Sequence, residues 1–246
     1  MATLAIGDIH GNRVALVDLL GRIEGEAGRG DTIVFLGDYI DRGPDSRACI
    51  DAILDFRGRS AARVVCLRGN HEDWLLRTYR DHTKHSWLLG MDGLDTVRSY
   101  SAHAHATLQE ARRKVGLDLY LEPVALPYEV LFDAMPPAHR TFLTTLEASC
   151  STADCFCSHG GLDPAVPIDA QRPDALIGGG LGFPSDYRGE TLVVYGHWND
   201  AVLDSDGWPH PNIRANTIGT DTSAHGVVTG VRLPDRRVFQ SGRYLI

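Results

Sequence analysis

The sequence predicts an α/β fold, on the strength of two observations. Short runs of β-branched and apolar residues alternate with segments that carry apolar residues at helical spacing. Each run is followed directly by glycine or by a polar loop, as expected where a strand ends. This alternation is typical of strands joined by crossover helices. The clearest runs are residues 3–6, 32–36, 63–67, 154–157 and 191–195.

Two crossover helices are expected between the first three strands, at residues 14–23 and 47–56. Both segments repeat apolar residues every three or four positions, which places those side chains on one face of a helix. The second segment follows an Arg-Gly-Pro-Asp-Ser turn. Ser46 is its expected N-cap, because a serine hydroxyl accepts a hydrogen bond from the first helical turn.

A mainly helical insertion is expected at about residues 74–149, within a single domain that spans residues 1–246. After the insertion the pattern returns to strands, and Pro234-Asp235 forms a turn between the last two of them. The expected helices of the insertion are residues 74–79, 94–100, 104–115 and 137–146, and the expected late strands are residues 216–220, 226–233 and 237–240.

The composition excludes several classes of protein. With 24 basic and 32 acidic residues the net charge is −8, so we expect neither bulk nucleic-acid binding nor attraction to an anionic membrane. No run approaches the ~20 apolar residues that cross a bilayer, and we expect a cytoplasmic protein. The five cysteines are expected to be reduced. Three of them, Cys150, Cys155 and Cys157, match no zinc-binding spacing and are expected in the core.

Polar side chains that can bind metals follow five of the predicted strands. Because ligands bind beyond the carboxyl ends of strands in α/β sheets, we expect these side chains to form one shared site. The clusters are Gly7-Asp8-Ile9-His10, Gly37-Asp38, Gly69-Asn70-His71, His159-Gly160 and Gly196-His197.

The residue types in these clusters indicate two divalent metal ions. Asp8 and His10 are separated by one residue, so in extended chain their side chains leave the same face and can bind one ion. Asp38 is the candidate for a carboxylate that bridges two ions. Mixed carboxylate, imidazole and amide ligands suit manganese, which we expect, with iron or zinc as the alternatives.

The same motifs carry a family resemblance. Gly-Asp-Ile-His-Gly, Gly-Asp-Tyr-Ile-Asp-Arg-Gly and Gly-Asn-His-Glu, together with residues 93–100 and 158–162, resemble the calcineurin-like metallophosphoesterase superfamily. Within it they are most similar to the bacterial and phage branch of the serine/threonine phosphoprotein phosphatases. The resemblance implies a sandwich of two mixed β-sheets flanked by helices.

The resemblance also implies a role for each site residue. Asp8, His10 and Asp38 would hold one ion, while Asp38, Asn70, His159 and His197 would hold the other. A water or hydroxide that bridges the ions would attack phosphorus directly.

Three further residues would assist the reaction. His71 would be the general acid for the leaving oxygen, and Asp41 would hold its imidazolium. Arg42 would bind the phosphate with its planar guanidinium.

The leading hypothesis is a phosphoric monoester hydrolase that acts on phosphoserine or phosphothreonine, or also on phosphotyrosine. The partner would be a phosphoprotein or a small phosphoester. The alternative is a symmetric diadenosine tetraphosphate hydrolase, because such enzymes share the metal motifs. A catalytically silent metal-binding regulator is the third hypothesis. Composition and motifs assign no oligomeric state.

Two departures from the family pattern keep these hypotheses open. A second phosphate-binding arginine is absent from residues 174–180, and Arg172, Arg188 or Arg214 could replace it. The family's Gly-His-Thr is Gly-His-Trp here, and Trp198 could pack on the core or stack on a nucleobase.

Overall fold

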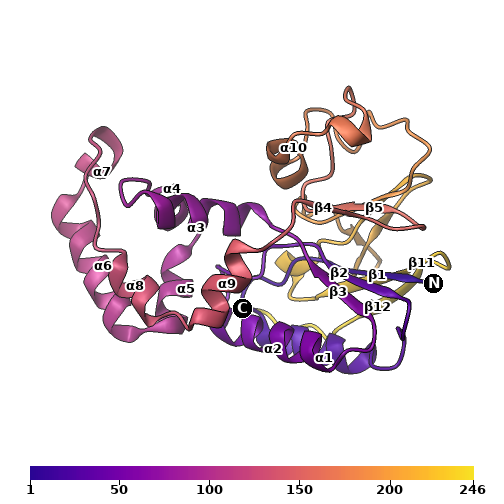
Figure 1. The fold of residues 1–246 in the computed structure, drawn as a ribbon, viewed down its shortest axis with the longest axis horizontal. Coiled ribbons are helices and arrows are strands. Elements are labelled where there is room, and N and C mark those ends of the chain that lie inside the picture. The colour runs from indigo at the N-terminus through magenta and orange to yellow at the C-terminus, as the bar shows by residue number, and fades with distance from the viewer.

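The computed structural model describes all residues, 1–246, and has two five-stranded mixed β-sheets at its centre (Figure 1). The first sheet has the order β12-β11-β1-β2-β3, and the second has the order β4-β5-β6-β10-β9. In the first sheet β1, β2 and β3 are parallel, and in the second β5, β6 and β10 are parallel. Strand β11 pairs antiparallel with β1 and with β12, and in the second sheet β4 and β9 pair antiparallel with β5 and β10. The architecture confirms the predicted α/β sandwich of two mixed sheets flanked by helices.

The strands that form these sheets are short. Those of the first sheet are β1 (Thr3–Ile6), β2 (Thr32–Phe35), β3 (Arg63–Cys66), β11 (Thr229–Leu233) and β12 (Arg237–Gln240). Those of the second are β4 (Ser149–Ser151), β5 (Phe156–Ser158), β6 (Val193–Tyr195), β9 (Asn212–Ile213) and β10 (Thr217–Gly219). A separate hairpin consists of β7 (Val202–Leu203) and β8 (Pro209–His210).

The two sheets bury one apolar layer between them. Side chains alternate along each strand, so that in β1 Ala5 faces the second sheet while Leu4 and Ile6 face the opposite side. Cys150, Cys155 and Cys157 lie in the layer between the sheets, and all five cysteines are buried free thiols. The expectation that the cysteines are core residues is thereby confirmed.

Helices α1 (Arg13–Arg22) and α2 (Ser46–Arg59) cover the outer face of the first sheet (Figure 1). Asn12 caps α1, since its Oδ1 accepts a hydrogen bond from the Ala15 N–H at 3.1 Å. The prediction that Ser46 caps α2 is wrong: Asp45 holds the cap position and makes no side-chain cap bond. The Ser46 hydroxyl instead accepts a hydrogen bond from the Asp41 N–H at 3.1 Å. Ser46 therefore supports the loop after β2.

Seven helices lie between β3 and β4 and form the left part of Figure 1. Helix α3 begins at Asn70, four residues earlier than the sequence predicts and after a short loop from β3, so Asn70 and His71 lie in its first turn. The helices are α3 (Asn70–Arg80), α4 (Ser86–Gly90), α5 (Gly93–Tyr100), α6 (Ala102–Val115), α7 (Asp118–Leu121), α8 (Glu129–Ala134) and α9 (Pro137–Thr144). Helix α10 (Pro173–Gly178) covers the outer face of the second sheet.

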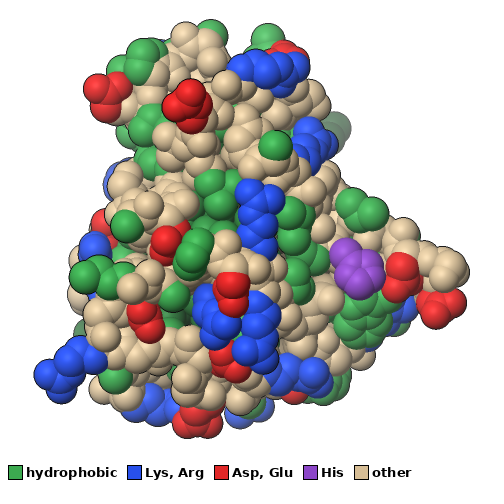
Figure 2. Space-filling view, turned by 90° about the vertical axis from the view of Figure 1, so that its right-hand side faces the viewer, with side chains coloured by type: hydrophobic (Ala, Val, Ile, Leu, Met, Phe, Trp, Pro, Cys, Tyr) green, Lys and Arg blue, Asp and Glu red, His purple; other side chains and the backbone are tan.

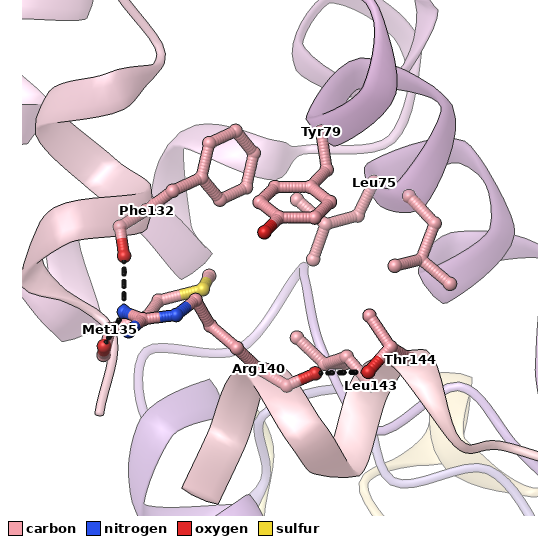
Figure 3. A pocket seen from close by; sticks show the side chains of 8 residues that line it. Leu75, Tyr79, Phe132, Met135, Arg140, Leu143 and Thr144 are labelled. Carbon is pink, nitrogen blue, oxygen red and sulfur yellow. Dashed lines mark hydrogen bonds between the residues drawn. The ribbon is translucent and has the colours of Figure 1, made fainter. Parts of the chain in front are cut away.

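The junction of α3, α8 and α9 contains a small cavity (Figure 3). Leu75, Tyr79 and Phe132 point toward one another there, and the Arg140 guanidinium donates a hydrogen bond to the Phe132 carbonyl at 2.8 Å. The cavity measures about 10 Å³, which is about the space one water molecule requires. It is a packing defect between helices and too small for a ligand.

One late strand is shorter than predicted. The sequence predicts a strand from residue 226, but residues Ser223–His225 form a 3-10 turn and Gly226 adopts φ 73°, so β11 begins at Thr229. The left-handed conformation of Gly226 ends the turn and is incompatible with extended chain. Ser223 and Gly226 of this turn line the same cavity as His10 and Arg42.

The face at the right of Figure 1 carries basic side chains near acidic ones (Figure 2). The hairpin of β11 and β12 ends on this side of the molecule. Its Arg232 and Arg237 both donate to Glu26, at 2.5 and 3.0 Å, and Arg232 also donates to Asp235 at 2.6 Å. The charges of Arg232 and Arg237 therefore have carboxylate partners. None of the helices is both long and apolar enough to span a membrane.

Candidate metal centre

The six expected ligands meet at one end of the two sheets. Each of the five loops that carry them leaves the carboxyl end of a strand, namely β1, β2 and β3 of the first sheet and β5 and β6 of the second. The site therefore lies where the two sheets meet, and its side chains come from both. Of the six, Asp8, His10, Asp38 and His159 are buried, while Asn70 and His197 are partly exposed.

Asp38 lies at the middle of this group. Its Oδ2 is 3.5 Å from His10 Nε2 and 3.4 Å from His159 Nε2. Two sets of side chains that could hold a metal contain it: Asp38 with His10 and His71, and Asp38 with His159 and His197. Its carboxylate thus faces both sets of side chains, which is the position that a bridging ligand requires.

Asn70 and Asp8 lie next to these two sets of side chains, Asn70 beside His159 and His197, and Asp8 beside His10. Asn70 Oδ1 lies 2.9 Å from both His159 Nε2 and His197 Nδ1. The Asp8 carboxylate accepts hydrogen bonds from the His197 N–H at 3.1 and 3.2 Å, and its Oδ2 is 3.9 Å from His10 Nε2. All six expected ligands therefore converge on a region a few ångströms across.

Several of these residues have a left-handed backbone. The φ angles are 48° for His10, 53° for Asp38 and 68° for His197. Such conformations cost free energy for residues other than glycine, and they persist where the surrounding structure enforces them, as at active sites. Gly37 has φ 120°, and a Cβ on it would lie 2.5 Å from the Gly69 nitrogen, so the loops after β2 and β3 touch through their backbones.

Glu72 is a site residue that sequence reasoning missed. Its buried carboxylate accepts hydrogen bonds from the N–H groups of Asp38 at 3.0 Å, Tyr39 at 2.9 Å and Gly69 at 3.0 Å. It therefore ties the loop of Asp38 to the start of α3. The signal was available, because Glu72 is the last residue of the Gly-Asn-His-Glu motif and occupies the third helical position, where a glutamate reaches back to the cap. Burial raises its pKa to about 7, and the charge of Asp38 adds to this effect.

Asp221 was also missed. It is buried in the turn after β10, where it accepts hydrogen bonds from the Asn199 N–H at 2.9 Å and the Ser223 hydroxyl at 2.7 Å. Burial raises the pKa of Asp8, and the negative charge of Asp221 raises it further. Asp221 directly follows the strand expected at residues 216–220, so the pattern of polar residues at strand ends could have found it.

The protonation of His10, His197 and Asp38 suits metal ligands. Burial lowers the pKa of His10 to about 4 and, together with the charge of His159, that of His197 to about 4. Both imidazoles are therefore neutral at pH 7, as metal binding requires. Burial opposes the ionisation of Asp38, but His159, His71 and His10 hold its pKa well below the usual range. Asp38 thus remains a carboxylate. Burial opposes the charged form of His159, but Asp38 and Asp8 raise its pKa to about 9, so His159 would release a proton on binding an ion.

The spacing of the donor atoms also suits a metal ion. Ligand atoms at about 2.0–2.2 Å from a tetrahedral ion lie roughly 3.3–3.6 Å apart. The distances from Asp38 Oδ2 to the imidazole nitrogens of His10 and His159, 3.5 and 3.4 Å, agree with this value. Oxygen and nitrogen donors without a thiolate fit divalent ions of the manganese, iron and zinc type. The residues present can therefore hold two divalent cations.

His71 and Asp41 form a buried pair next to the ligands. His71 Nδ1 is 2.8 Å from Asp41 Oδ2, and its Nε2 faces Asp38 Oδ2 at 3.9 Å. Burial opposes protonation of His71, but the carboxylates of Asp38 and Asp41 raise its pKa above the ordinary value. The two carboxylates therefore favour the protonated ring, whose Nε2 faces the centre.

The helices between β3 and β4 hold Asp41 in place. The indole N–H of Trp87 donates to Asp41 Oδ2 at 2.8 Å, and the Thr96 hydroxyl donates to Asp41 Oδ1 at 2.5 Å. Both residues are fully buried, on α4 and α5. Sequence reasoning did not assign Trp87 or Thr96 to the site, although Thr96 lies within the stretch of residues 93–100 that carried the family resemblance.

Arg42 lies over the ligands. Its Nη1 is 2.9 Å from His10 Nε2, and its Nη2 is 3.5 Å from His71 Nε2. The arginines that could have replaced the absent second one have partners elsewhere: Arg172 pairs with Asp174 at 3.4 Å, and Arg188 donates to the Ser185 carbonyl at 2.6 Å. Arg214 is on the surface beside Asn212. Arg42 is the arginine that faces the centre.

Trp198 lies at the rim next to His197. Its indole N–H donates to the Gly160 carbonyl at 2.9 Å, and 38% of the residue is exposed. The ring packs on the backbone of Gly179, where a Cβ would lie 2.2 Å from it. Trp198 is therefore fixed in place and still presents part of its ring to solvent.

Comparison with known proteins identifies the family. A model of the calcineurin-like phosphoesterase family matches residues 1–230. The chain belongs to the calcineurin-like phosphoesterases. Members of this family use divalent metals, in agreement with the donor set of the site. The superfamily predicted from the motifs is confirmed.

Curated relatives of this phosphoesterase match it over nearly their whole length. The symmetrical bis(5'-nucleosyl)-tetraphosphatase of Janthinobacterium sp. (strain Marseille) is 40% identical over 276 residues, covering 98% of this chain and 96% of the relative. The enzyme of the same description from Pectobacterium carotovorum subsp. carotovorum (strain PC1) is 27% identical, covering 97% and 94%. A solved structure described as a candidate diadenosine tetraphosphatase has a TM-score of 0.62 at 21% identity and covers 97% of this chain and 92% of that one, which supports the fold.

These relatives overturn the leading functional prediction. The expectation of a phosphoserine or phosphothreonine phosphatase with a phosphoprotein partner is wrong, because the relatives that match over nearly their whole length are symmetrical bis(5'-nucleosyl)-tetraphosphatases. The prediction of a phosphoric monoester hydrolase depended on the same substrate class and is not supported by these relatives. The assignment to the phosphoesterases is confirmed. The error has a physical cause. The motifs are those of a metal centre at which an activated water attacks phosphorus, and this chemistry is common to both substrate classes.

Proposed function

We propose that the chain is a metal-dependent hydrolase that cleaves dinucleoside tetraphosphates symmetrically, so that diadenosine tetraphosphate gives two molecules of ADP. The observation that carries the catalytic part is the position of Asp38, whose carboxylate faces metal-capable side chains on both sides. The relative from Janthinobacterium supports the substrate class. The proposal replaces the protein phosphatase hypothesis.

Two divalent ions are part of the proposal, with manganese as the expected metal and iron or zinc as the alternatives. Asp8, His10 and Asp38 would hold one, and Asp38, Asn70, His159 and His197 the other. When bound, such a pair of ions supplies Lewis acidity at the phosphate and an activated water.

The other residues of the site would bind substrate and transfer a proton. Arg42 presents its guanidinium beside His10 and His71, where it can donate two hydrogen bonds to a phosphate. His71 Nε2 would donate its proton to the oxygen of the leaving nucleoside diphosphate. Asp41 favours the protonated ring and fixes its orientation through Nδ1.

The helical segment between β3 and β4 would be part of the same catalytic unit. Trp87 and Thr96 donate to the two oxygens of Asp41 and so determine how that carboxylate faces His71. We therefore propose that the expected insertion at about residues 74–149 acts within the single domain of residues 1–246.

A substrate panel with product analysis tests the proposal. Purified protein would be loaded with manganese, analysed for metal content, and supplied in separate reactions with diadenosine tetraphosphate, p-nitrophenyl phosphate and a phosphopeptide. We expect about two ions per chain and ADP as the sole nucleotide product of the first substrate. Formation of AMP and ATP would contradict symmetric cleavage. A preference for p-nitrophenyl phosphate or the phosphopeptide would refute the substrate class.

A further inference from the structure

A second cavity opens beside the metal centre, and the proposed reaction assigns it no role. Its volume is about 460 Å³, within the range of roughly 300–1,000 Å³ that is usual for ligand pockets. One wall consists of His10 and Arg42, which also belong to the centre. The remaining wall includes Asp92, Asp95, Leu245 and Ile246.

We propose that this cavity binds one nucleoside of a dinucleoside polyphosphate, an inference that rests on the proposed function. The argument begins with Arg42, which lines both the metal centre and the cavity. A phosphate held by Arg42 therefore lies at the entrance of the cavity. The nucleoside attached to the polyphosphate can then enter it.

The charge of the cavity favours a nucleoside over more phosphate. Asp92 and Asp95 provide two carboxylates, which repel an anionic chain but accept hydrogen bonds from the ribose hydroxyls and from the exocyclic amine of adenine. Dinucleotide-binding sites use an acidic residue in the same way, on the ribose. Away from Arg42, this wall therefore suits a neutral group with several donors better than a further phosphate.

The two carboxylates are presented by the start of α5. Asp92 is the residue before the helix and has φ 55°, and its side chain makes no cap hydrogen bond, although aspartate at this position commonly caps the helix. Asp95 lies one turn further along the same face, and its Oδ1 pairs with Arg98 at 3.2 Å. The Asp92 carboxylate thus remains available to a ligand, and Asp95 is held in place.

Leu245 and Ile246 form an apolar part of the cavity wall. They are 77% and 55% exposed. The residue before them is fixed, because the Tyr244 N–H donates to the Gly226 carbonyl at 2.7 Å and the Tyr244 carbonyl accepts from Asn12 Nδ2 at 2.6 Å. Figure 1 shows this end of the chain near α5. A base that lies on the two aliphatic side chains covers apolar area that is otherwise in water.

Direct binding of ADP and of pyrophosphate tests the assignment, since the two differ by the nucleoside alone. Dissociation constants would be measured by calorimetry on manganese-loaded protein for the parent and for Asp92→Asn/Asp95→Ala. Asparagine tolerates the left-handed backbone at position 92, and alanine is compatible with the helix at position 95. The control is Glu110→Ala, which removes an i,i+3 ion pair with Arg113 on α6, outside the cavity.

We expect the double variant to weaken ADP binding at least about tenfold and to leave pyrophosphate binding as strong as in the parent or stronger, since two negative charges are removed, while the control leaves both unchanged. Equal losses for ADP and pyrophosphate, no loss for ADP, or no ADP binding by the parent would each overturn the inference. Because binding is measured without turnover, the result for the nucleoside site does not depend on whether the chain is a hydrolase. A parent that binds ADP through this cavity but does not cleave diadenosine tetraphosphate would keep the nucleoside site and refute the hydrolase.

Discussion

The contact between Thr96 and Asp41 allows a test of how the helical segment supports the metal centre. The Thr96 hydroxyl donates to Asp41 Oδ1 at 2.5 Å and accepts from the Asp41 N–H at 2.9 Å. Thr96→Val keeps the shape of the side chain and removes both bonds, together with the bond between the Thr96 and Ser46 hydroxyls at 2.9 Å. Thr96→Ser is the matched control, because it keeps the hydroxyl and removes only a methyl group.

The structure sets the expected size of the effect. A hydrogen bond to a charged group contributes about 1.5–3 kcal/mol to stability. The Asp41 N–H retains the Ser46 hydroxyl at 3.1 Å, so the main loss is the bond to Asp41 Oδ1. We therefore expect Thr96→Val to lower the free energy of unfolding by about 2 kcal/mol. For a chain of this size that corresponds to a decrease in Tm of roughly 4–8 °C.

Catalysis should decrease in parallel. Burial raises the pKa of Asp41, and hydrogen bonds from His71, Thr96 and Trp87 oppose this rise. Without the Thr96 hydroxyl the carboxylate holds the His71 imidazolium less firmly. A loss of about 1.4 kcal/mol in the transition state would lower kcat roughly tenfold.

Thermal unfolding by circular dichroism and steady-state kinetics with diadenosine tetraphosphate would measure both effects. Thr96→Ser should cost no more than about 1 kcal/mol, because it removes a single methyl group, and it should retain most of kcat. If Thr96→Val and Thr96→Ser have the same Tm and the same kcat, Thr96 does not support Asp41 through its hydroxyl.

Three further substitutions test the centre itself. His71→Asn should lower kcat at least ~100-fold while metal content stays near two ions per chain, and unchanged turnover would remove His71 from the mechanism. Asp38→Asn should lower metal content at both positions, as measured by elemental analysis; loss of one ion alone would show that Asp38 is not shared. Glu72→Gln places an amide donor against backbone N–H groups and should lower the free energy of unfolding by about 3–5 kcal/mol, as measured by urea unfolding. Glu147→Gln, at an exposed position outside the site, serves as the control.

Local sequence patterns were sufficient to predict the strands and most helices that position the site. The three early strands end within one residue of their predicted ends. Their ends could be predicted because the apolar run and the glycine or polar loop that ends it are close together in the sequence. The late strands were less accurate. The strand predicted from residue 226 begins only at Thr229, because Gly226 adopts a left-handed conformation that closes the turn at Ser223–His225.

The sequence by itself determined the identity of the metal-capable side chains, since Asp8, His10, Asp38, Asn70, His159 and His197 each follow a strand in a recognisable motif. Only the tertiary structure decided what surrounds them. Glu72, Asp221, Trp87 and Thr96 reach the site from a helix start, a turn and two distant helices, and their roles depend on contacts between segments far apart in the chain. The cavity beside Arg42 likewise exists only because α5 and the last residues of the chain meet there. Ligand chemistry is encoded in short motifs, whereas the groups that orient those ligands and select the substrate are brought together by folding.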